Sequence, residues 1–163
     1  MKKTIIIQGS SKSLGNTHKV VNYLNKDNQF DVVDLKTKNI GSFDYEFANA
    51  DDDFLPLMEE IISKYDTIVF ATPVYWYSMS GILKDFFDRV SDLLHYKKEL
   101  GRQLRGKNLA MISNSTENDL KNGFTMPFIE SANYLGDTHS WLSNNNIAND
   151  AKVKIDAFRK IIS

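Results

Sequence analysis

Short apolar runs alternate with helical patterns along the whole chain, and this alternation limits the fold more than any other feature. The apolar runs predict strands at Thr4–Gln8, Phe30–Leu35, Thr67–Ala71, Leu109–Ser113 and about Gly136–Leu142. The helical patterns lie at about Thr17–Asn25, Phe54–Lys64, Gly81–Tyr96, Met126–Leu135 and Ala151–Ile162. Strands that alternate with helices pair in parallel through right-handed crossovers, so we expect an α/β fold with a parallel sheet.

The clearest helical pattern covers residues 81–96. Its apolar face consists of Ile82, Leu83, Phe86, Phe87, Val90, Leu93 and Leu94. Ser80 stands immediately before it and is expected to cap the helix. The strands are nearly continuous apolar runs, which is typical of a sheet with helices on both faces. The acidic run 51–53 is expected to be a solvated loop before the second helix.

Length and composition indicate one domain over residues 1–163. The chain is 42% apolar and 25% charged, as in an ordinary globular protein, and its formal charge of −1 argues against nucleic-acid binding. The absence of cysteine excludes disulfides, zinc–thiolate sites, iron–sulfur ligation and cysteine nucleophiles. No apolar run approaches the roughly 20 residues that span a membrane. We therefore expect a cytoplasmic protein without a membrane anchor.

The loop after the first strand has the composition of a phosphate-binding turn. The strand leads into Gly9-Ser10-Ser11-Lys12-Ser13-Leu14-Gly15-Asn16-Thr17, where a helix begins. Such a loop offers backbone N–H groups and hydroxyls, and the helix N-terminus adds a favourable dipole. The loop predicts a site for a terminal phosphate monoester, with Lys12 as a candidate cation. A Gly/Ser turn without a ligand is the alternative.

Two common nucleotide-binding loops do not match. A Walker A loop has four residues between its glycines and then Lys, whereas five residues separate Gly9 from Gly15 and Asn16 stands at the lysine position. A dinucleotide fingerprint has a second glycine two positions after the first, and position 11 is Ser. Asp34 could imitate a ribose-binding carboxylate, but one acid at a strand end does not define that site.

Two further loops follow strands and are expected at the same edge of the sheet, where ligands of such folds bind. The loop Pro73-Val74-Tyr75-Trp76-Tyr77 places three aromatic rings in succession. These rings suit a planar, partly apolar ligand, and a subunit interface is the open alternative. The loop that begins Ser113-Asn114-Ser115 offers polar groups to such a ring, although a plain turn is equally compatible.

With these loops the chain resembles the flavodoxin-like NAD(P)H-dependent FMN reductases and quinone reductases. The resemblance rests on the Gly9–Thr17 loop, on Thr72–Gly81 with the following Leu83-Lys84 and Phe87-Asp88-Arg89, and on Leu104-Arg105-Gly106-Lys107. It implies a flavodoxin-like three-layer sandwich with a five-stranded parallel sheet of order 2-1-3-4-5. Three features depart from the pattern: Lys12 replaces a frequent Arg, Ala71 replaces a frequent Gly, and residues 113–118 lack a glycine pair.

The resemblance also implies the cofactor-binding residues. Ser10, Lys12, Asn16 and Thr17 match the FMN phosphate ligands, and residues 73–76 match those around the isoalloxazine ring. With their neighbours, the expected set is Ser10, Ser11, Lys12, Ser13, Gly15, Asn16, Thr17, Pro73, Val74, Tyr75, Trp76, Tyr77, Ser113, Asn114 and Ser115. No side chain is expected to be catalytic and no metal is expected, because FMN carries the chemistry. Backbone amides near residues 74–76 are expected to stabilise charge on the reduced ring.

The expected function is an FMN-dependent oxidoreductase that passes a hydride from NADPH or NADH to a small acceptor. Quinones, azo or nitro compounds, free flavins and metal chelates all suit an open stacking site. The resemblance also implies a homodimer, although a tetramer is not excluded. One alternative is a flavodoxin-type electron carrier without small-molecule turnover. Such carriers are strongly acidic, so the charge of −1 favours the enzyme. A flavin-binding or interaction module without catalysis is the third hypothesis.

The three histidines and one basic stretch do not match a functional motif. His18, His95 and His139 are expected to be surface or structural residues, with His139 the best candidate for a contact beside the ring. The basic residues of the stretch 97–107 are Lys97, Lys98, Arg102, Arg105 and Lys107. Such stretches are usually solvated, and a contact with the extra phosphate of NADPH is the alternative.

Overall fold

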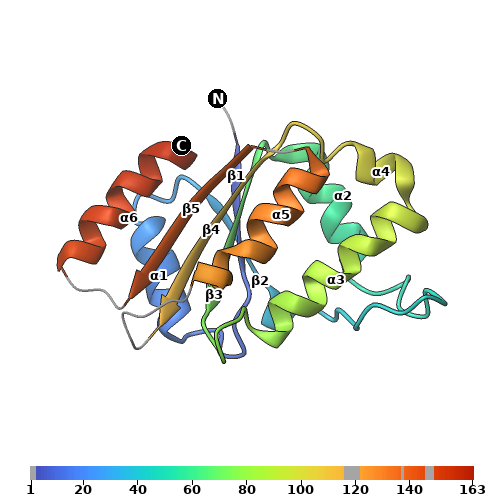
Figure 1. Ribbon diagram of the computed structural model, residues 1–163, viewed down its shortest axis with the longest axis horizontal. Helices are drawn as coiled ribbons and strands as arrows, with labels where there is room; N and C mark the ends of the chain where they lie inside the picture. The colour runs from blue at the N-terminus through green and yellow to red at the C-terminus, as the bar shows by residue number, and fades with distance from the viewer. Residues whose placement is uncertain (1–2, 116–121, 137, 146–148) are drawn as a thin grey trace.

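The structure is a computed structural model that describes residues 3–115, 122–136, 138–145 and 149–163, with the backbone alone at residues 122, 138–145 and 149–150. Its strands are β1 (Thr4–Gln8), β2 (Asp31–Asp34), β3 (Thr67–Pro73), β4 (Asn108–Ser115) and β5 (Thr138–Asn145). All neighbouring strands pair in parallel, in the order β2-β1-β3-β4, and β5 lies beside β4 (Figure 1). The expected α/β fold with a parallel sheet is confirmed.

The helices connect these strands as the sequence pattern predicts. They are α1 (Asn16–Leu24), α2 (Phe54–Lys64), α3 (Gly81–His95), α4 (Lys98–Arg102), α5 (Met126–Leu135) and α6 (Asn149–Ile162), with 3-10 turns η1 (Leu35–Thr37) and η2 (Asn122–Thr125). The bounds of α2 and α5 agree with the prediction, and α1, α3 and α6 differ by one or two residues. Within the described parts of the chain, no helix is long and apolar enough to cross a membrane.

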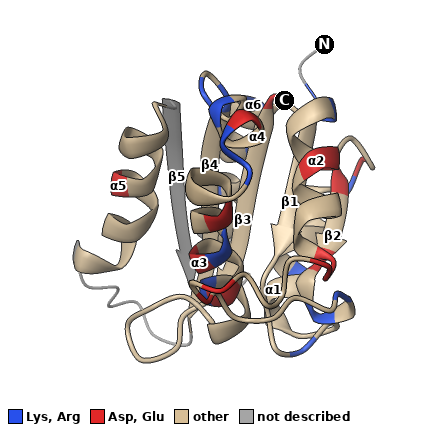
Figure 2. Ribbon diagram, turned by 90° about the vertical axis from the view of Figure 1, so that its right-hand side faces the viewer, with Lys and Arg blue, Asp and Glu red and all other residues tan. Residues whose placement is uncertain are grey.

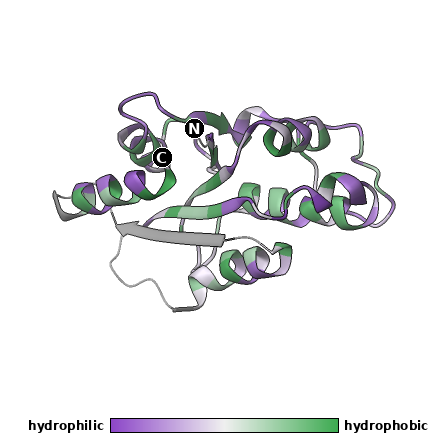
Figure 3. Ribbon diagram, turned by 90° about the horizontal axis from the view of Figure 1, so that it is seen from above, coloured by the Kyte–Doolittle hydropathy of each residue, from purple (hydrophilic) through white to green (hydrophobic). Residues whose placement is uncertain are grey.

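The sheet has an apolar core on each face. On one face, Ile6, Val69 and Ile112 pack against the helices α1 and α6. On the other face, Ile7 and Phe70 pack against α2, α3 and α5. Neighbouring residues of a strand point to opposite faces, so both faces are apolar because helices cover both. Figure 3 shows the hydrophobic residues, in green, along the strands and on the helix sides turned toward them.

Several element ends differ from the predicted ones for local reasons. β2 ends at Asp34 because Leu35 begins a 3-10 turn, which the Asp34 carboxylate caps by accepting from the Lys36 amide at 3.0 Å. This contact gives the Asp34 side chain a structural role. The strand predicted from Gly136 starts at residue 138, since Gly136 ends α5 in the left-handed conformation with φ 76°. The five-residue α4 was not predicted because it is too short to carry an apolar period.

A buried arginine fastens the long connection between η1 and α2. Arg89 of α3 is 1% exposed, and its guanidinium lies 2.5 Å from Asp52 and 2.8 Å from Asp92. It also donates to the carbonyls of Gly41 and Asn49. The expectation that the acidic run is a solvated loop is therefore wrong for Asp52. Burial opposes ionisation of this carboxyl, but the hydrogen bonds from Arg89 and two backbone amides outweigh it and keep the pKa below its usual value.

Candidate functional site

The loops predicted to bind a ligand meet at the carboxyl edge of the sheet. The strand order reverses between β1 and β3, because the chain passes from β1 outward to β2 and then returns to the other side of β1. In open α/β sheets this switch point is where ligands bind. The loops after β1 and β3 both start here, at the lower edge of the sheet in Figure 1.

The first loop leaves the start of α1 without a cap. Gly15 occupies the N-cap position, no side chain bonds the first turn, and that turn holds no acidic residue. The amides of Asn16 and Thr17 have no acceptor among the residues that the structure describes. Free amides at a helix N-terminus carry a partial positive charge and bind anions. The α1 end can therefore receive an anion such as a phosphate.

The side chains of this loop divide into an inner and an outer set. Ser10 is 3% exposed, and its hydroxyl accepts from the Lys12 amide at 3.3 Å. Ser13 and Gly15 are half-buried, whereas the side chains of Ser11, Lys12 and Asn16 are exposed. The outer set can approach a ligand directly, and Ser10 holds the turn from within.

The prediction of a loop from Ser113 is wrong, because Ser113, Asn114 and Ser115 continue β4, and Asn114 joins the end of this strand to the other two loops. The buried Thr17 hydroxyl of the first loop donates to the Asn114 side-chain oxygen at 2.8 Å. The backbone carbonyl of Asn114 accepts from the Val74 amide of the aromatic loop at 2.9 Å. On either side of it, Ser113 is buried and Ser115 is half-buried. The structure therefore brings the predicted residues of β4 against both other loops, while residues 116–118 lie outside the described chain.

The aromatic loop is a tight turn with unusual backbone angles. Tyr75 and Ser78 exchange backbone hydrogen bonds of 2.9 and 3.0 Å around the two central residues. These two are Trp76 with φ 49° and Tyr77 with φ 62°. Positive φ at both centres is the pattern of hairpin turns that normally carry Asn-Gly. For bulky residues this conformation costs on the order of 1–3 kcal/mol each, and such strain is concentrated at ligand sites.

The turn presents its rings to solvent beside the first loop. Trp76 is 94% exposed, Tyr77 is 59% exposed and Tyr75 is 47% exposed. The hydroxyl of Tyr75 lies 3.4 Å from that of Ser11, which is longer than a usual hydroxyl hydrogen bond. Pro73 is buried as the last residue of β3, and Val74 is half-buried. The rings of the three aromatic residues are therefore available for stacking, next to the anion-binding end of α1.

Sequence reasoning missed several residues that hold the loops together. The Ser80 hydroxyl caps α3 at the Leu83 amide and donates to the Gly9 carbonyl at 2.8 Å. The Ser80 amide in turn donates to the Thr72 hydroxyl at 3.1 Å. Gly9 has no room for a side chain, because a Cβ there would lie 2.6 Å from Leu83 Cβ. The cap of α3 was predictable from Ser80, but its second bond to Gly9 was not.

Gln8 is the other missed residue, at the end of β1. Its Nε2 donates to the Ser13 carbonyl at 2.9 Å, so it supports the first loop from beneath. Its Oε1 is buried and has no hydrogen-bond partner among the described residues. A buried acceptor without a donor is costly, so this atom is suited to a ligand hydroxyl or a bound water.

The donor set of this edge fits a phosphorylated planar cofactor such as FMN. Free amides, hydroxyls and Lys12 surround the α1 end, and exposed aromatic rings stand beside it. The residues that the structure describes contain no group of three acidic, cysteine or histidine side chains suited to a metal. The amides, hydroxyls and rings at this edge are therefore suited to an organic anion.

His18 lies in the first turn of α1 beside the first loop, whereas His95, His139 and the basic stretch lie away from the three loops. His18 pairs with Asn22 on α1 at 3.0 Å, His95 ends α3, and His139 stands opposite Leu109 in β5, where only the backbone is described. The basic stretch directly precedes β4, so it lies at the amino edge, opposite the three loops. Lys107 there donates to two carbonyls at the end of α2. The position of the basic stretch therefore gives no support to its alternative role, a contact with the extra phosphate of NADPH.

Comparisons with known proteins agree with this arrangement. A Bacillus subtilis (strain 168) protein named as an NAD(P)H-dependent FMN-containing oxidoreductase, YwqN, is 35% identical over 103 residues, which cover 56% of this chain and 54% of the relative. The NADPH azoreductase of Bacillus sp. (strain OY1-2) is 26% identical over 89 residues, 55% of this chain and 50% of the relative. The chain thus spans about half the length of the curated relatives it matches.

A solved structure extends the likeness to the whole fold. The NADPH-quinone reductase from P. pentosaceus superposes with a TM-score of 0.72 at 18% identity, covering 100% of this chain and 98% of that one. At this identity the likeness concerns the fold, and it agrees with a flavodoxin-like α/β architecture. The sequence model of one family, described as NADPH-dependent FMN reductase, matches residues 2–122, which include the first two loops and β4. The chain therefore belongs to the NADPH-dependent FMN reductase family.

Proposed function

We propose that this protein is an FMN-dependent NAD(P)H oxidoreductase that reduces a small organic acceptor, with residues 1–163 acting as one FMN-binding domain. The uncapped α1 end beside an exposed aromatic turn is the observation that carries the proposal. Family membership and the names of the relatives support the same chemistry. When bound, FMN accepts electrons from a nicotinamide and passes them to the acceptor.

The first loop would hold the FMN phosphate. The amides of Asn16 and Thr17, the hydroxyls of Ser11 and Ser13, and the Lys12 ammonium are the donors that would meet it. Charge-assisted hydrogen bonds of this kind are about twice as strong as neutral ones. Ser10 and Gly15 would shape the turn, since Ser10 is buried and Gly15 precedes the helix.

The turn 73–77 would lie against the isoalloxazine ring, and two amides in it are available for the ring. The amides of Val74 and Tyr75 donate to Asn114 and Ser78, whereas those of Trp76 and Tyr77 have no acceptor in the described chain. We assign to the Trp76 amide the task of stabilising negative charge on the ring. Ser113, Asn114 and Ser115 would border the same ring from β4.

The decisive experiment compares FMN with riboflavin and then measures turnover. The purified protein should bind FMN at least tenfold more tightly than riboflavin, which lacks the phosphate, in a fluorescence-quenching titration. The FMN-loaded protein should then consume NADPH or NADH steadily in the presence of a quinone. Equal affinity for both flavins would remove the phosphate assignment. FMN binding without turnover would favour the flavodoxin-type carrier.

The acceptor and the assembly follow from separate measurements. The NADPH azoreductase and NADPH-quinone reductase among the similar proteins make an azo dye and a quinone the first acceptors to compare. The exposed Trp76 and Tyr77 would leave one side of the ring open to either. We further propose a homodimer, which sedimentation of the FMN-loaded protein tests directly.

A further inference from the structure

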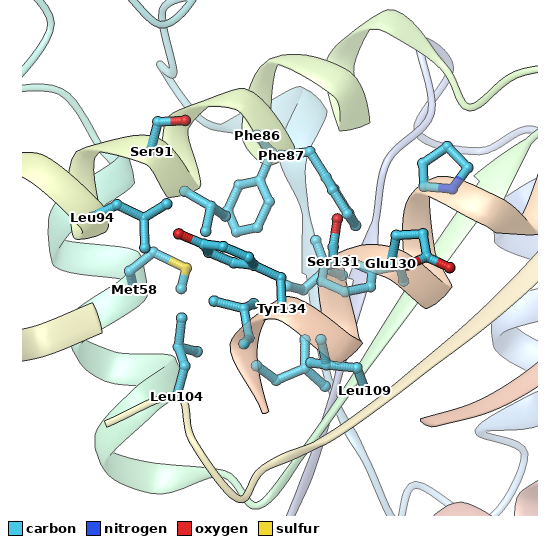
Figure 4. Close-up of a pocket in the computed structure, with 16 residues that line it drawn as sticks. Met58, Phe86, Phe87, Ser91, Leu94, Leu104, Leu109, Glu130, Ser131 and Tyr134 are labelled. Carbon is cyan, nitrogen blue, oxygen red and sulfur yellow. The ribbon is translucent and has the colours of Figure 1, made fainter. Parts of the chain in front are cut away.

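A cavity that none of the three loops lines lies between α3 and α5 over the sheet. Its volume is about 370 Å3. Apolar side chains from the sheet and three helices form most of its wall (Figure 4), among them Met58, Phe70, Phe86, Val90, Leu104 and Leu109. A cavity of about 150 Å3 accepts one benzene, so this one has room for two fused rings. Its size is also that of ordinary ligand pockets.

A basic groove continues this cavity toward α4. The groove has a volume of about 410 Å3 and shares Leu94, Tyr134 and Leu135 with the cavity. Three cationic side chains line it, namely Lys98, Arg102 and Arg105. Figure 2 shows the positive charge of α4 and of the turn that follows, in blue. The apolar cavity is therefore continuous with the positively charged groove.

Two of the three cations are available for a ligand. Arg102 forms an exposed pair with Glu99. Lys98 and Arg105 have exposed side chains and no ion pair or hydrogen bond to a side chain among the residues described. An arginine guanidinium binds a carboxylate through two parallel hydrogen bonds, so Arg105 is suited to that group.

The distribution of charge orients the ligand. Glu130 is the acidic residue of the cavity wall, and Figure 4 shows it and Leu94 at opposite ends, with the Tyr134 ring between them. Leu94 borders the basic groove. An anionic group is therefore favoured at the groove end and disfavoured at the Glu130 end.

We propose that the cavity and the groove together bind a small amphipathic carboxylate. Its hydrocarbon part, up to two fused rings in size, fills the cavity beside Phe86 and Leu109, and its carboxylate binds Arg105 and Lys98. The groove lies toward the amino edge of the sheet, since residues 98–105 precede β4, and the proposal does not depend on the proposed FMN chemistry. No residue of the three loops lines the cavity or the groove.

The test compares an acid with the matching neutral alcohol on the FMN-treated full chain. We expect 2-naphthoate to bind about tenfold more tightly than 2-naphthalenemethanol in isothermal titration calorimetry, because only the acid makes charge-assisted bonds. Arg105→Gln combined with Lys98→Gln should abolish this preference while binding of the alcohol persists. Lys160→Gln, an exposed lysine on α6, is the matched control and should keep the preference.

Cavity-filling variants locate the apolar part. Ser131→Phe on α5 and Ser91→Leu on α3 both place bulk in the cavity and should each abolish binding of acid and alcohol. Equal binding of the two compounds, binding that survives both substitutions, or no binding up to about 1 mM would each overturn the proposal. A dimer that Ser131→Phe dissociates, with no naphthoate binding, would instead identify this face as a contact between two copies.

Discussion

The hydrogen bond from Thr17 to Asn114 offers the sharpest test of how the first loop is built. Thr17→Val keeps the shape of the side chain and removes the hydroxyl that donates at 2.8 Å. The buried Asn114 oxygen then loses its donor, which costs about 1–3 kcal/mol. At about 3 °C per kcal/mol for a domain of this size, the Tm should fall by about 3–9 °C. Differential scanning calorimetry of the FMN-free protein measures this change.

The same variant should also weaken FMN binding. Thr17 supplies the second free amide of the α1 end, and its hydroxyl ties that end to β4, so the phosphate donors lose their fixed position. Displacement of one such donor removes a charge-assisted contact with the phosphate, worth about 1.5–3 kcal/mol, which corresponds to a loss of tenfold or more in affinity. Fluorescence titration with FMN gives the value.

A matched control separates stability from binding. Thr4 is also buried, and its hydroxyl donates to the Ile162 carbonyl at 2.6 Å, at the start of β1 and far from the loops. Thr4→Val should therefore lower the Tm by a similar amount and leave FMN affinity unchanged. If Thr17→Val binds FMN as well as Thr4→Val does, the assignment of the phosphate to this loop is refuted.

Two other substitutions test packing and ionisation. Gly9→Ala should cost about 1–3 kcal/mol in urea unfolding, because the new Cβ would lie 2.6 Å from Leu83 Cβ, whereas Gly81→Ala meets open space and should not destabilise; equal effects would contradict the close approach. Burial and the hydrogen bond to Asp31 raise the pKa of Tyr65 to about 12, above its value of about 10 in the unfolded chain. Since the folded state holds this proton more tightly, the stabilisation is complete below about pH 10 and is lost as the pH rises toward 12. Ultraviolet titration should find one tyrosine with a pKa well above the others, and Asp31→Asn should lower this pKa toward 10. If the high pKa persists in that variant, the pairing of Tyr65 with Asp31 is refuted.

The sequence predicted most of the fold because its local signals agree with one another. The helix α2 begins and ends as expected, and Ser80 caps α3 as its position indicated. The position of the site could be predicted from the strand ends, because the carboxyl ends of parallel strands lie at one edge of the sheet. The loops after β1 and β3 and the end of β4 therefore meet as expected, although their role in binding FMN stays a proposal.

The rest depends on contacts between residues far apart in the chain. Thr17 and Asn114 are 97 positions apart, and neither residue type predicts the other. Arg89 lies on an apolar helix face where the pattern favours hydrophobic residues, and it is buried because acidic partners come from α3 itself and from the segment before α2. The positive φ angle of Trp76 could not be predicted either, since large aromatic residues normally avoid positive φ.

The turn at Trp76 and Tyr77 has a consequence for protein engineering. An Asn-Gly pair adopts these backbone angles with little strain. Replacing Trp76 and Tyr77 by Asn and Gly should therefore raise the free energy of unfolding by about 1 kcal/mol or more. The same change would delete two rings that stand ready for a flat molecule. Selection for thermal stability alone would therefore favour loss of the aromatic rings that are proposed to contact the ligand.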